Sequence, residues 1–370
     1  MSETLTASPP PTTVRGFVPA LEGMRGFAAL GVLVTHVAFQ TGATSTPILG
    51  RIWGRFDMAV ALFFGLSGFL LWRAHAAAAR GQGRRPSTKR YLIHRAARIL
   101  PAYWVVVVVV LALLPQAGGG LRVWVSNLAL VQVFVPLTLT DGLTQMWSLS
   151  VEVAFYLVLP ILAFAAAALR PQWRIPALLA LTVLSLGWSF VDVPTPDAIH
   201  ADNWLPGYFP WFAAGMILAE MVCSGYAFAR QRGVMAAVAL TAFLLSTTEL
   251  AGPEGLTRAE PWQHAIKMGL GGILGFALLA PLVLGDHPHR ILTSRVALAI
   301  GRWSYGIFIW HVAVLSIVFP VFGIVPFGGS FFFVLVLTVV LSIPIASASY
   351  ALVEEPVRRA VKQWERKSAP

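Results

Sequence analysis

Cysteine and charge are scarce in this chain of 370 residues. The one cysteine, Cys223, cannot form an intramolecular disulfide, so cysteine usage does not indicate a redox compartment. Charged residues make up 12% of the chain, about half the share of a soluble protein, whereas apolar residues make up 57%. With a mean hydropathy of +0.73, the composition excludes a soluble globular protein and indicates one embedded in a lipid bilayer.

Motifs of soluble enzymes and binding proteins are missing as well. There is no Gly-rich phosphate loop and no Gly-x-Ser-x-Gly motif. His287 and His289 flank a proline, but no further ligands complete the set that zinc requires, so we expect no metal. The net charge of +11 is not accompanied by a soluble domain in which basic and aromatic residues interleave, so we expect no nucleic acid partner.

Long apolar runs are what the chain does have. An α-helix needs about 17 to 25 mainly apolar residues to cross a bilayer, and we find ten such segments. The sequence therefore predicts an all-α, polytopic integral membrane protein with ten transmembrane helices. Their approximate ranges are 23–40, 58–73, 99–115, 146–168, 175–191, 205–222, 234–249, 265–284, 303–320 and 331–352.

An eleventh apolar run, residues 121–137, is interrupted by Arg122, Asn127 and Gln132, and we interpret it as a re-entrant or interfacial segment. Lys and Arg are enriched in short cytoplasmic loops. With ten spans and both termini in the cytoplasm, five of the 27 basic residues lie outside. An eleventh span would move the basic clusters near residues 170–174 and 230–232 outside. The five basic residues that lie outside in the ten-span arrangement are Arg51, Arg55, Arg122, Arg258 and Lys267.

One membrane domain, residues 15–360, accounts for nearly the whole chain. Residues 1–14 are polar and Pro-rich and lack the basic start of a signal peptide, so we expect a disordered tail. Residues 361–370 are expected to form a cytoplasmic C-terminal tail. The abundance of Ala, Gly and Arg suggests a bacterial source, and hence a multi-pass protein of the bacterial plasma membrane.

The first span carries polar residues on a single face. Arg25 and His36 are eleven residues apart, so in a helix they lie within roughly 20° of each other and about 16 Å apart along the axis. Glu22, three residues before Arg25, joins this face and can pair with it. Arg25 would lie near the cytoplasmic surface and His36 in the outer half. The alternatives are an interfacial anchor for Arg25 and a packing role for His36.

Glu152 lies about six residues into a span that begins at the outer surface, at a depth similar to that of His36, with Ser148 and Phe155 on its helix face. Ionisable groups inside a bilayer are costly and therefore indicate function. A histidine oriented by a carboxylate is a competent general base, so we predict that Glu152 orients His36. The alternative is that Glu152 is a structural partner of an arginine.

Further polar residues complete the predicted site. Arg95 and Arg98, spaced i and i+3 at the cytoplasmic end of the third span, suit phosphate groups, although lipid headgroup contact is an alternative. His311 could be a second catalytic or acyl-lining group, or a structural histidine. Ser67 suits close helix packing. The residues that we expect to line an acyl or acceptor pocket are Ser67, Ser148, Tyr305 and His311.

Six motifs follow one another along the chain: ALEGMRGFAALGVLVTH, VALFFGLSGFLLWR, HRAARILPAYW, WSLSVEVAFYLVLP, GRWSYGIFIWH and SYALVEEPVRR. With these motifs, residues 15–360 resemble the acyltransferase-3 family of integral membrane acyltransferases. Two departures from the family pattern are Glu22, where Asp is commoner, and Ala61, where many members have Asp.

The resemblance implies transfer of an acyl group, usually acetyl, from cytoplasmic acyl-CoA to a hydroxyl of a sugar or a sugar-decorated product. It assigns the catalytic histidine to His36, its paired arginine to Arg25, the CoA-binding arginines to Arg95 and Arg98, and the mid-chain glutamate to Glu152. A saccharide, a glycolipid and a macrolide-like compound all fit as acceptor. Many relatives carry an additional SGNH-type domain, so this chain either acylates its acceptor directly or hands the group to a separate extracytoplasmic transferase.

Two other classes of function fit the residues. In a transporter or flippase, His36 and Glu152 would form a proton relay, and transport would need no CoA. In a structural membrane protein these side chains would serve packing alone, and their replacement would lower stability without loss of a specific activity.

Overall fold

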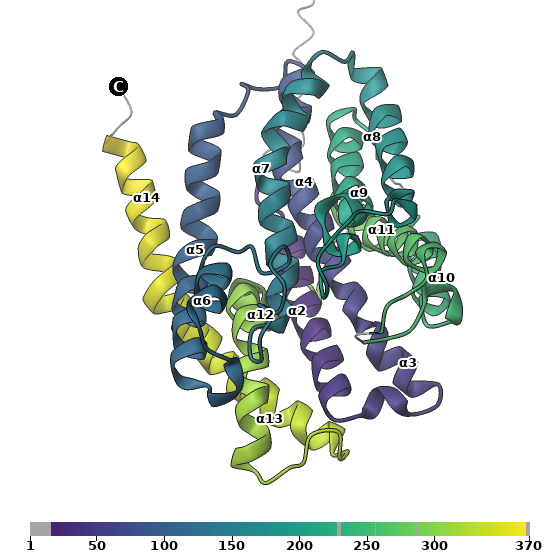
Figure 1. Ribbon diagram of the computed structural model, residues 1–370. Helices are drawn as coiled ribbons and strands as arrows, with labels where there is room; N and C mark the ends of the chain where they lie inside the picture. Colours follow the sequence, from purple (N-terminus) through teal and green to yellow (C-terminus); the bar gives the residue numbers. More distant parts are fainter. Residues whose placement is uncertain (1–15, 228–230, 256, 286–287, 368–370) are drawn as a thin grey trace, which may run out of the picture.

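The computed structural model describes residues 16–227, 231–255, 257–285 and 288–367, and within these residues all regular structure is helical. Figure 1 shows one bundle of helices, with α13 near its lower end in this view and α14 at its edge beside α5. The predicted N-terminal tail, residues 1–14, lies outside the described residues. The division into tail and membrane domain stays a prediction.

Each of the ten predicted spans contains a helix. In order these are α2 (Pro19–Gln40), α4 (Ala59–Ala79), α5 (Thr88–Leu113), α7 (Trp147–Ala167), α8 (Pro171–Leu186), α9 (Leu205–Cys223), α10 (Arg232–Ser246), α11 (Pro261–Val283), α12 (Arg295–Val321) and α13 (Phe331–Ser349). The longest departure is at α5, which begins eleven residues before the predicted 99 and so takes Arg95 and Arg98 into the helix.

Shorter elements connect these helices. Helix α3 (Leu49–Gly54) and the short helix η2 (Arg55–Met58) lead from α2 to α4. Helix α6 (Leu121–Leu128) is all the helix that forms in residues 121–137. Its eight residues span about 12 Å, which is too short to cross a bilayer and agrees with the predicted re-entrant or interfacial segment. After α13 the chain continues through a π-helical turn, η8 (Tyr350–Glu354), into α14 (Glu355–Lys367).

Seven helical segments of the described chain are long and apolar enough to cross a membrane, namely Leu49–Ala79, Thr88–Leu113, Thr144–Ala167, Pro171–Phe190, Pro261–Val283, Arg295–Val321 and Phe331–Lys367. Their outward surfaces are apolar: on α7, Ile161 is 67% exposed and Phe164 83% exposed. Side chains of this kind gain by contact with lipid and lose by contact with water. The chain is therefore a multi-pass membrane protein.

Helices α2 and α12 approach each other closely, and this contact positions the face of α2 that carries Arg25 and His36. A Cβ atom on Gly26 would lie 2.9 Å from the backbone nitrogen of Gly301, and one on Gly301 would collide with the carbonyl group of Glu22. Small residues at a crossing let two membrane helices pack backbone against backbone. The glycines therefore bring α2, which carries Arg25 and His36, against α12, which carries His311.

A buried carboxylate holds α4, α8 and α9 together at the end of the bundle where α4 ends. The fully buried Glu220 accepts hydrogen bonds from Trp72 Nε1 at 2.7 Å, Arg174 Nε at 2.7 Å and Arg80 Nη1 at 2.5 Å. The guanidinium of Arg174 also lies 5.3 Å from the centre of the Trp72 ring. Two cations and a ring nitrogen compensate the buried charge, as a buried ion requires.

Candidate active site

A narrow cavity inside the bundle collects most of the predicted site residues. Its wall contains Arg25 from α2, Arg98 from α5, and Ser148 and Glu152 from α7. The free space is about 40 Å³, which holds a few water molecules at most. The rest of the wall is formed by Val60, Phe63, Phe64, Ile99, Leu149, Tyr156, Ser304, Tyr305 and Phe308.

The inner part of this cavity has an excess of cationic groups. Arg98 interacts electrostatically with both Arg25 and Arg95. Arg25 is held by Glu22, whose carboxylate lies 3.9 Å from Arg25 Nη1, and Arg95 lies 5.9 Å from the centre of the Tyr156 ring. Within the described residues the buried Nε atoms of Arg25 and Arg95 have no hydrogen-bond partner. Three guanidinium groups, two of them with an unused donor, suit an anionic ligand.

Glu152 lies in the cavity wall, and its hydrogen bonds differ from the prediction. Its Oε1 atom accepts from the hydroxyl groups of Ser67 and Tyr156, the latter at 2.6 Å. These contacts bring Ser67 to the cavity residues through Glu152. In the described chain no hydrogen bond joins Glu152 to His36, so these contacts give the predicted orientation of His36 by Glu152 no support, and the role of Glu152 stays a prediction.

His36 pairs instead with His311, a predicted pocket residue. His311 Nε2 lies 3.3 Å from His36 Nδ1, and the two rings meet edge to face with centres 5.0 Å apart. His36 Nδ1 also lies 2.8 Å from the carbonyl oxygen of Val32, and His311 Nδ1 lies 2.8 Å from that of Phe308. Both bonds repeat the i to i−4 or i−3 spacing of a helix, so each ring is anchored to its own backbone.

These contacts assign the protons of the two rings. A carbonyl oxygen only accepts a hydrogen bond, so Nδ1 carries the proton in His36 and in His311. His311 Nε2 is then an acceptor and shares the Nδ1 proton of His36 with Val32. His36 Nε2 keeps a lone pair in the neutral ring. The arrangement therefore leaves one basic nitrogen on His36 that is able to take up a proton.

Two aromatic rings connect the cavity with the histidine pair. Phe63 and Phe308 both line the cavity, and their ring centres are 5.9 Å apart. The Phe308 ring centre is 6.1 Å from that of His311. The cavity wall and the histidine pair thus adjoin each other along α12.

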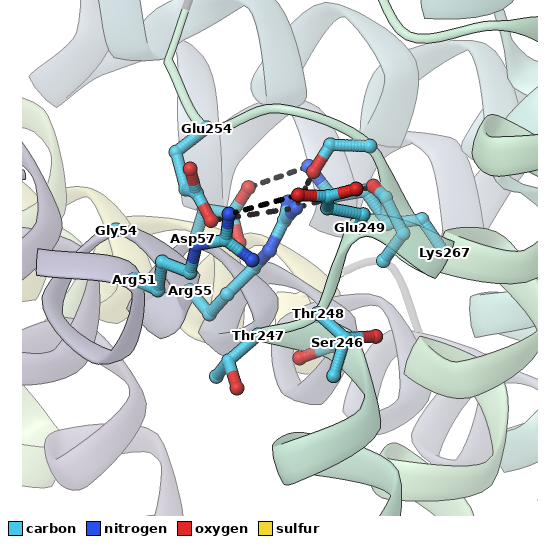
Figure 2. A network of polar contacts seen from close by, with 12 residues as sticks. Arg51, Gly54, Arg55, Asp57, Ser246, Thr247, Thr248, Glu249, Glu254 and Lys267 are labelled. Atoms are coloured by element: carbon cyan, nitrogen blue, oxygen red, sulfur yellow. Dashed lines mark hydrogen bonds and ion pairs between the residues drawn. The ribbon is translucent and has the colours of Figure 1, made fainter. Parts of the chain in front are cut away.

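A polar network holds the segment between α10 and α11 against the chain that follows α2 (Figure 2). The fully buried Arg55 donates to the carbonyl oxygens of Ala251, at 3.2 Å, and Gly252, and its Nη2 lies 3.7 Å from Glu254 Oε1. The ion pairs Arg51–Glu249, at 3.4 Å, and Lys267–Asp57, at 2.6 Å, flank these contacts.

This network reaches the neighbourhood of His36. Thr35, the residue before it, donates a hydrogen bond of 2.8 Å to the carbonyl oxygen of Gly54. The Asp57 carboxylate interacts electrostatically with His36. The sequence analysis treats Arg55 only as a charge outside the membrane, because nothing in its spacing indicates a contact with residues 249–254. Tyr156 was missed too, although it follows Glu152 by one helical turn.

Metal ligands do not cluster in the part of the chain that the structure describes: no group of three or more His, Cys, Asp and Glu side chains could hold an ion. His289 lies 3.1 Å from Arg232, and His287 lies outside the described residues. The expectation that the protein needs no metal stays a prediction.

Several known proteins with similar sequences are acyltransferases by name. Acyltransferase MdmB of Streptomyces mycarofaciens is 29% identical over 337 residues, covering 83% of this chain and 80% of that protein. The peptidoglycan O-acetyltransferase OatA of Listeria monocytogenes is 24% identical over 93% of this chain, and OatA of Staphylococcus aureus 23%. The chain spans 56% and 57% of these two longer proteins.

No solved structure matches the chain significantly. A family model described as an acyltransferase domain matches residues 18–347, which is most of the chain. Together with the multi-pass helical bundle, this match shows that the chain belongs to the acyltransferase-3 family of membrane O-acyltransferases.

Proposed function

We propose that this acyltransferase moves an acetyl group from acetyl-CoA to a hydroxyl group of a carbohydrate or glycosylated product, in the bacterial plasma membrane. One observation carries the proposal. Helix α2 joins a cavity rich in arginine, at Arg25, to a histidine with a basic nitrogen, at His36. The two residues are about 16 Å apart along the helix, a span suited to a long donor with phosphates at one end and a thioester at the other.

The proposed topology has ten spans and both termini in the cytoplasm. The seven candidate segments contain seven of the ten predicted helices, and α2, α9 and α10 supply the others. Helix α2, with 22 residues, measures about 33 Å and α10, with 15 residues, about 22 Å. In this topology the basic linker between α4 and α5 is cytoplasmic and the α10–α11 segment faces outward.

The donor enters from the cytoplasm. Its phosphates bind Arg98 and Arg25, with Arg95 beside them, because guanidinium groups form paired hydrogen bonds with phosphate oxygens. The pantetheine arm extends outward past Phe63 and Phe308, so the thioester reaches His36. Since the cavity has only about 40 Å³ of free space, side chains must move apart when the donor binds.

The chemistry then needs one base. His36 Nε2 removes the proton of the acceptor hydroxyl while its oxygen attacks the thioester carbonyl carbon. The carbon–sulfur bond breaks, the ester forms, and the CoA thiolate takes the proton from the imidazolium. While the imidazolium exists, Nε2 of His311 accepts a hydrogen bond from its Nδ1–H group and so stabilises the cation. In a two-step variant, His36 itself attacks the thioester and carries the acetyl group before passing it on.

The acceptor class is a hydroxyl on a saccharide, a glycolipid or a macrolide-like glycoside. It is supported by the name of the OatA relative, a peptidoglycan O-acetyltransferase, and by an outward face lined with charged groups beside His36. The chain either completes the transfer there or supplies acetyl groups to a separate extracytoplasmic transferase.

Purified protein in lipid nanodiscs, incubated with labelled acetyl-CoA and a panel of glycosides, tests this function. We expect label in the glycoside fraction, or acetyl-CoA hydrolysis without an acceptor, and loss of both in His36→Ala. If the parent protein neither binds CoA nor consumes acetyl-CoA, the proposal fails. Accumulation of a solute in proteoliposomes without CoA would favour a transporter instead.

A further inference from the structure

Glu354 occupies an unusual backbone segment beside the donor cavity. Between α13 and α14 the chain forms a π-helical turn over Tyr350–Glu354. Turns of this kind are rare, and they occur frequently at functional sites. Because the turn holds one more residue than an α-helical turn, it shifts the register of the helix, and here it directs Glu354 inward while Glu355 remains at the surface.

The π-helical turn packs against α5 and α12, two of the helices that line the donor cavity. Tyr305 of α12 bridges them, because its hydroxyl donates a 2.8 Å hydrogen bond to the carbonyl oxygen of Ile99, the residue after Arg98. The Glu354 carboxylate interacts electrostatically with Arg98, with Arg358 of α14 and with Arg25. Glu354 belongs to the motif SYALVEEPVRR, but nothing in the motif predicts its place beside Arg98.

The carboxylate is buried but incompletely bonded. Glu354 is 7% exposed, and in the described chain its Oε1 atom has no hydrogen-bond partner. Glu152, the acid in the cavity wall, has both Ser67 and Tyr156 as donors. A buried, unsatisfied carboxylate costs free energy, and the charges of Arg98, Arg358 and Arg25 offset part of that cost.

We propose that Glu354 is a counter-ion that neutralises the Arg25–Arg98 site when no donor is bound and competes with the donor's phosphates for it. This role rests on the proposed function, because it takes the arginines as the CoA phosphate site. The spent product carries the same phosphates as the donor. A carboxylate that weakens phosphate binding therefore keeps CoA from remaining bound after transfer, and Glu354 acts as a positioning residue for the arginines.

Binding of CoA to the purified protein, measured by calorimetry, tests the inference without turnover. Glu354→Gln keeps the size of the side chain and removes its charge. Without this competing charge the arginines should attract the CoA phosphates more strongly, so we expect the CoA dissociation constant to fall about tenfold. Pyrophosphate, which carries only the anionic part of CoA, should also bind more tightly to Glu354→Gln than to the parent. Under turnover, KM and kcat should both fall, because product release slows.

Glu355→Gln is the matched control: it removes a charge from the next residue, which is partly exposed and pairs with Arg359 at 2.9 Å. It should leave CoA affinity unchanged, and Glu354→Asp should stay close to the parent. If Glu354→Gln does not fold, Glu354→Met removes the same charge. Unchanged or weaker CoA binding in a folded, charge-free variant overturns the inference while the parent's binding upholds the proposed function. A parent that does not bind CoA overturns both.

Discussion

The imidazole of His311 lies edge to face against that of His36, with Nε2 of the first 3.3 Å from Nδ1 of the second. The partner of the predicted catalytic histidine is thus a second histidine, on α12. Nε2 of His311 accepts a hydrogen bond from the Nδ1–H group of His36.

Replacement of either histidine tests this pair. We expect His36→Ala to lower kcat by about 10² to 10⁴, the usual contribution of a general base. His311→Gln should lower kcat by only about tenfold, since the base remains and only its cation loses support. Rates of acetyl-CoA consumption measure both effects. Equal losses in the two variants would contradict the division of roles, and unchanged CoA affinity serves as the control for folding.

Arg98 and Arg25 should determine donor affinity. Arg98→Ala removes charge-assisted hydrogen bonds worth about 1.5 to 3 kcal/mol each, so we expect the CoA dissociation constant to rise about tenfold or more. Arg84→Ala, at an exposed residue of the basic α4–α5 linker, is the control and should leave it unchanged. Equal weakening in both would mean that net charge, and not the cavity, attracts CoA.

The carboxylate of Glu152 should act on the donor cavity and not on the base. Tyr156→Phe removes one of its two hydroxyl partners, and we expect KM for acetyl-CoA to rise several-fold while the pH dependence of kcat is preserved. Measurement of the pH–rate profile separates the possibilities. A profile displaced in Tyr156→Phe would show that Glu152 influences His36 after all.

The Glu220 cluster should contribute to stability alone. Glu220→Ala leaves the buried Arg174 without its charge partner, and loss of one partner of a buried pair costs about 3 to 5 kcal/mol. Thermal unfolding in detergent should show a large decrease in midpoint. Glu249→Ala, which breaks the exposed pair with Arg51, should cost at most about 1 kcal/mol. A small effect at Glu220 would mean that the arginines find other partners.

The outer network should control access of the acceptor. Arg55→Ala frees the segment that carries Ala251, Gly252 and Glu254 from its main anchor. We expect KM for the acceptor to change several-fold while CoA affinity stays constant. Kinetics with one varied acceptor at saturating acetyl-CoA provide the measurement. A change in CoA affinity and none in acceptor KM would be the contrary result.

The helices could be predicted from the sequence because each apolar run has the length that a bilayer demands. The shared face of Arg25 and His36 followed from helical geometry, since both lie in α2. The hydrogen bonds of Glu152 with Ser67 and Tyr156 could not be predicted, because a similar depth of Glu152 and His36 says nothing about the direction in which α7 points its side chains. Glu354 escaped notice because a π-helical turn changes a register that the sequence pattern assumes to be regular.

Helix α12 contributes Tyr305 and Phe308 to the cavity wall and His311 to the histidine pair. Phe308 and His311 lie three residues apart, about 60° around the helix and 4.5 Å along it. A rotation of α12 that admits the donor by moving Phe308 must also turn His311 away from His36. The width of the cavity and the geometry of the histidine pair are therefore coupled through one helix.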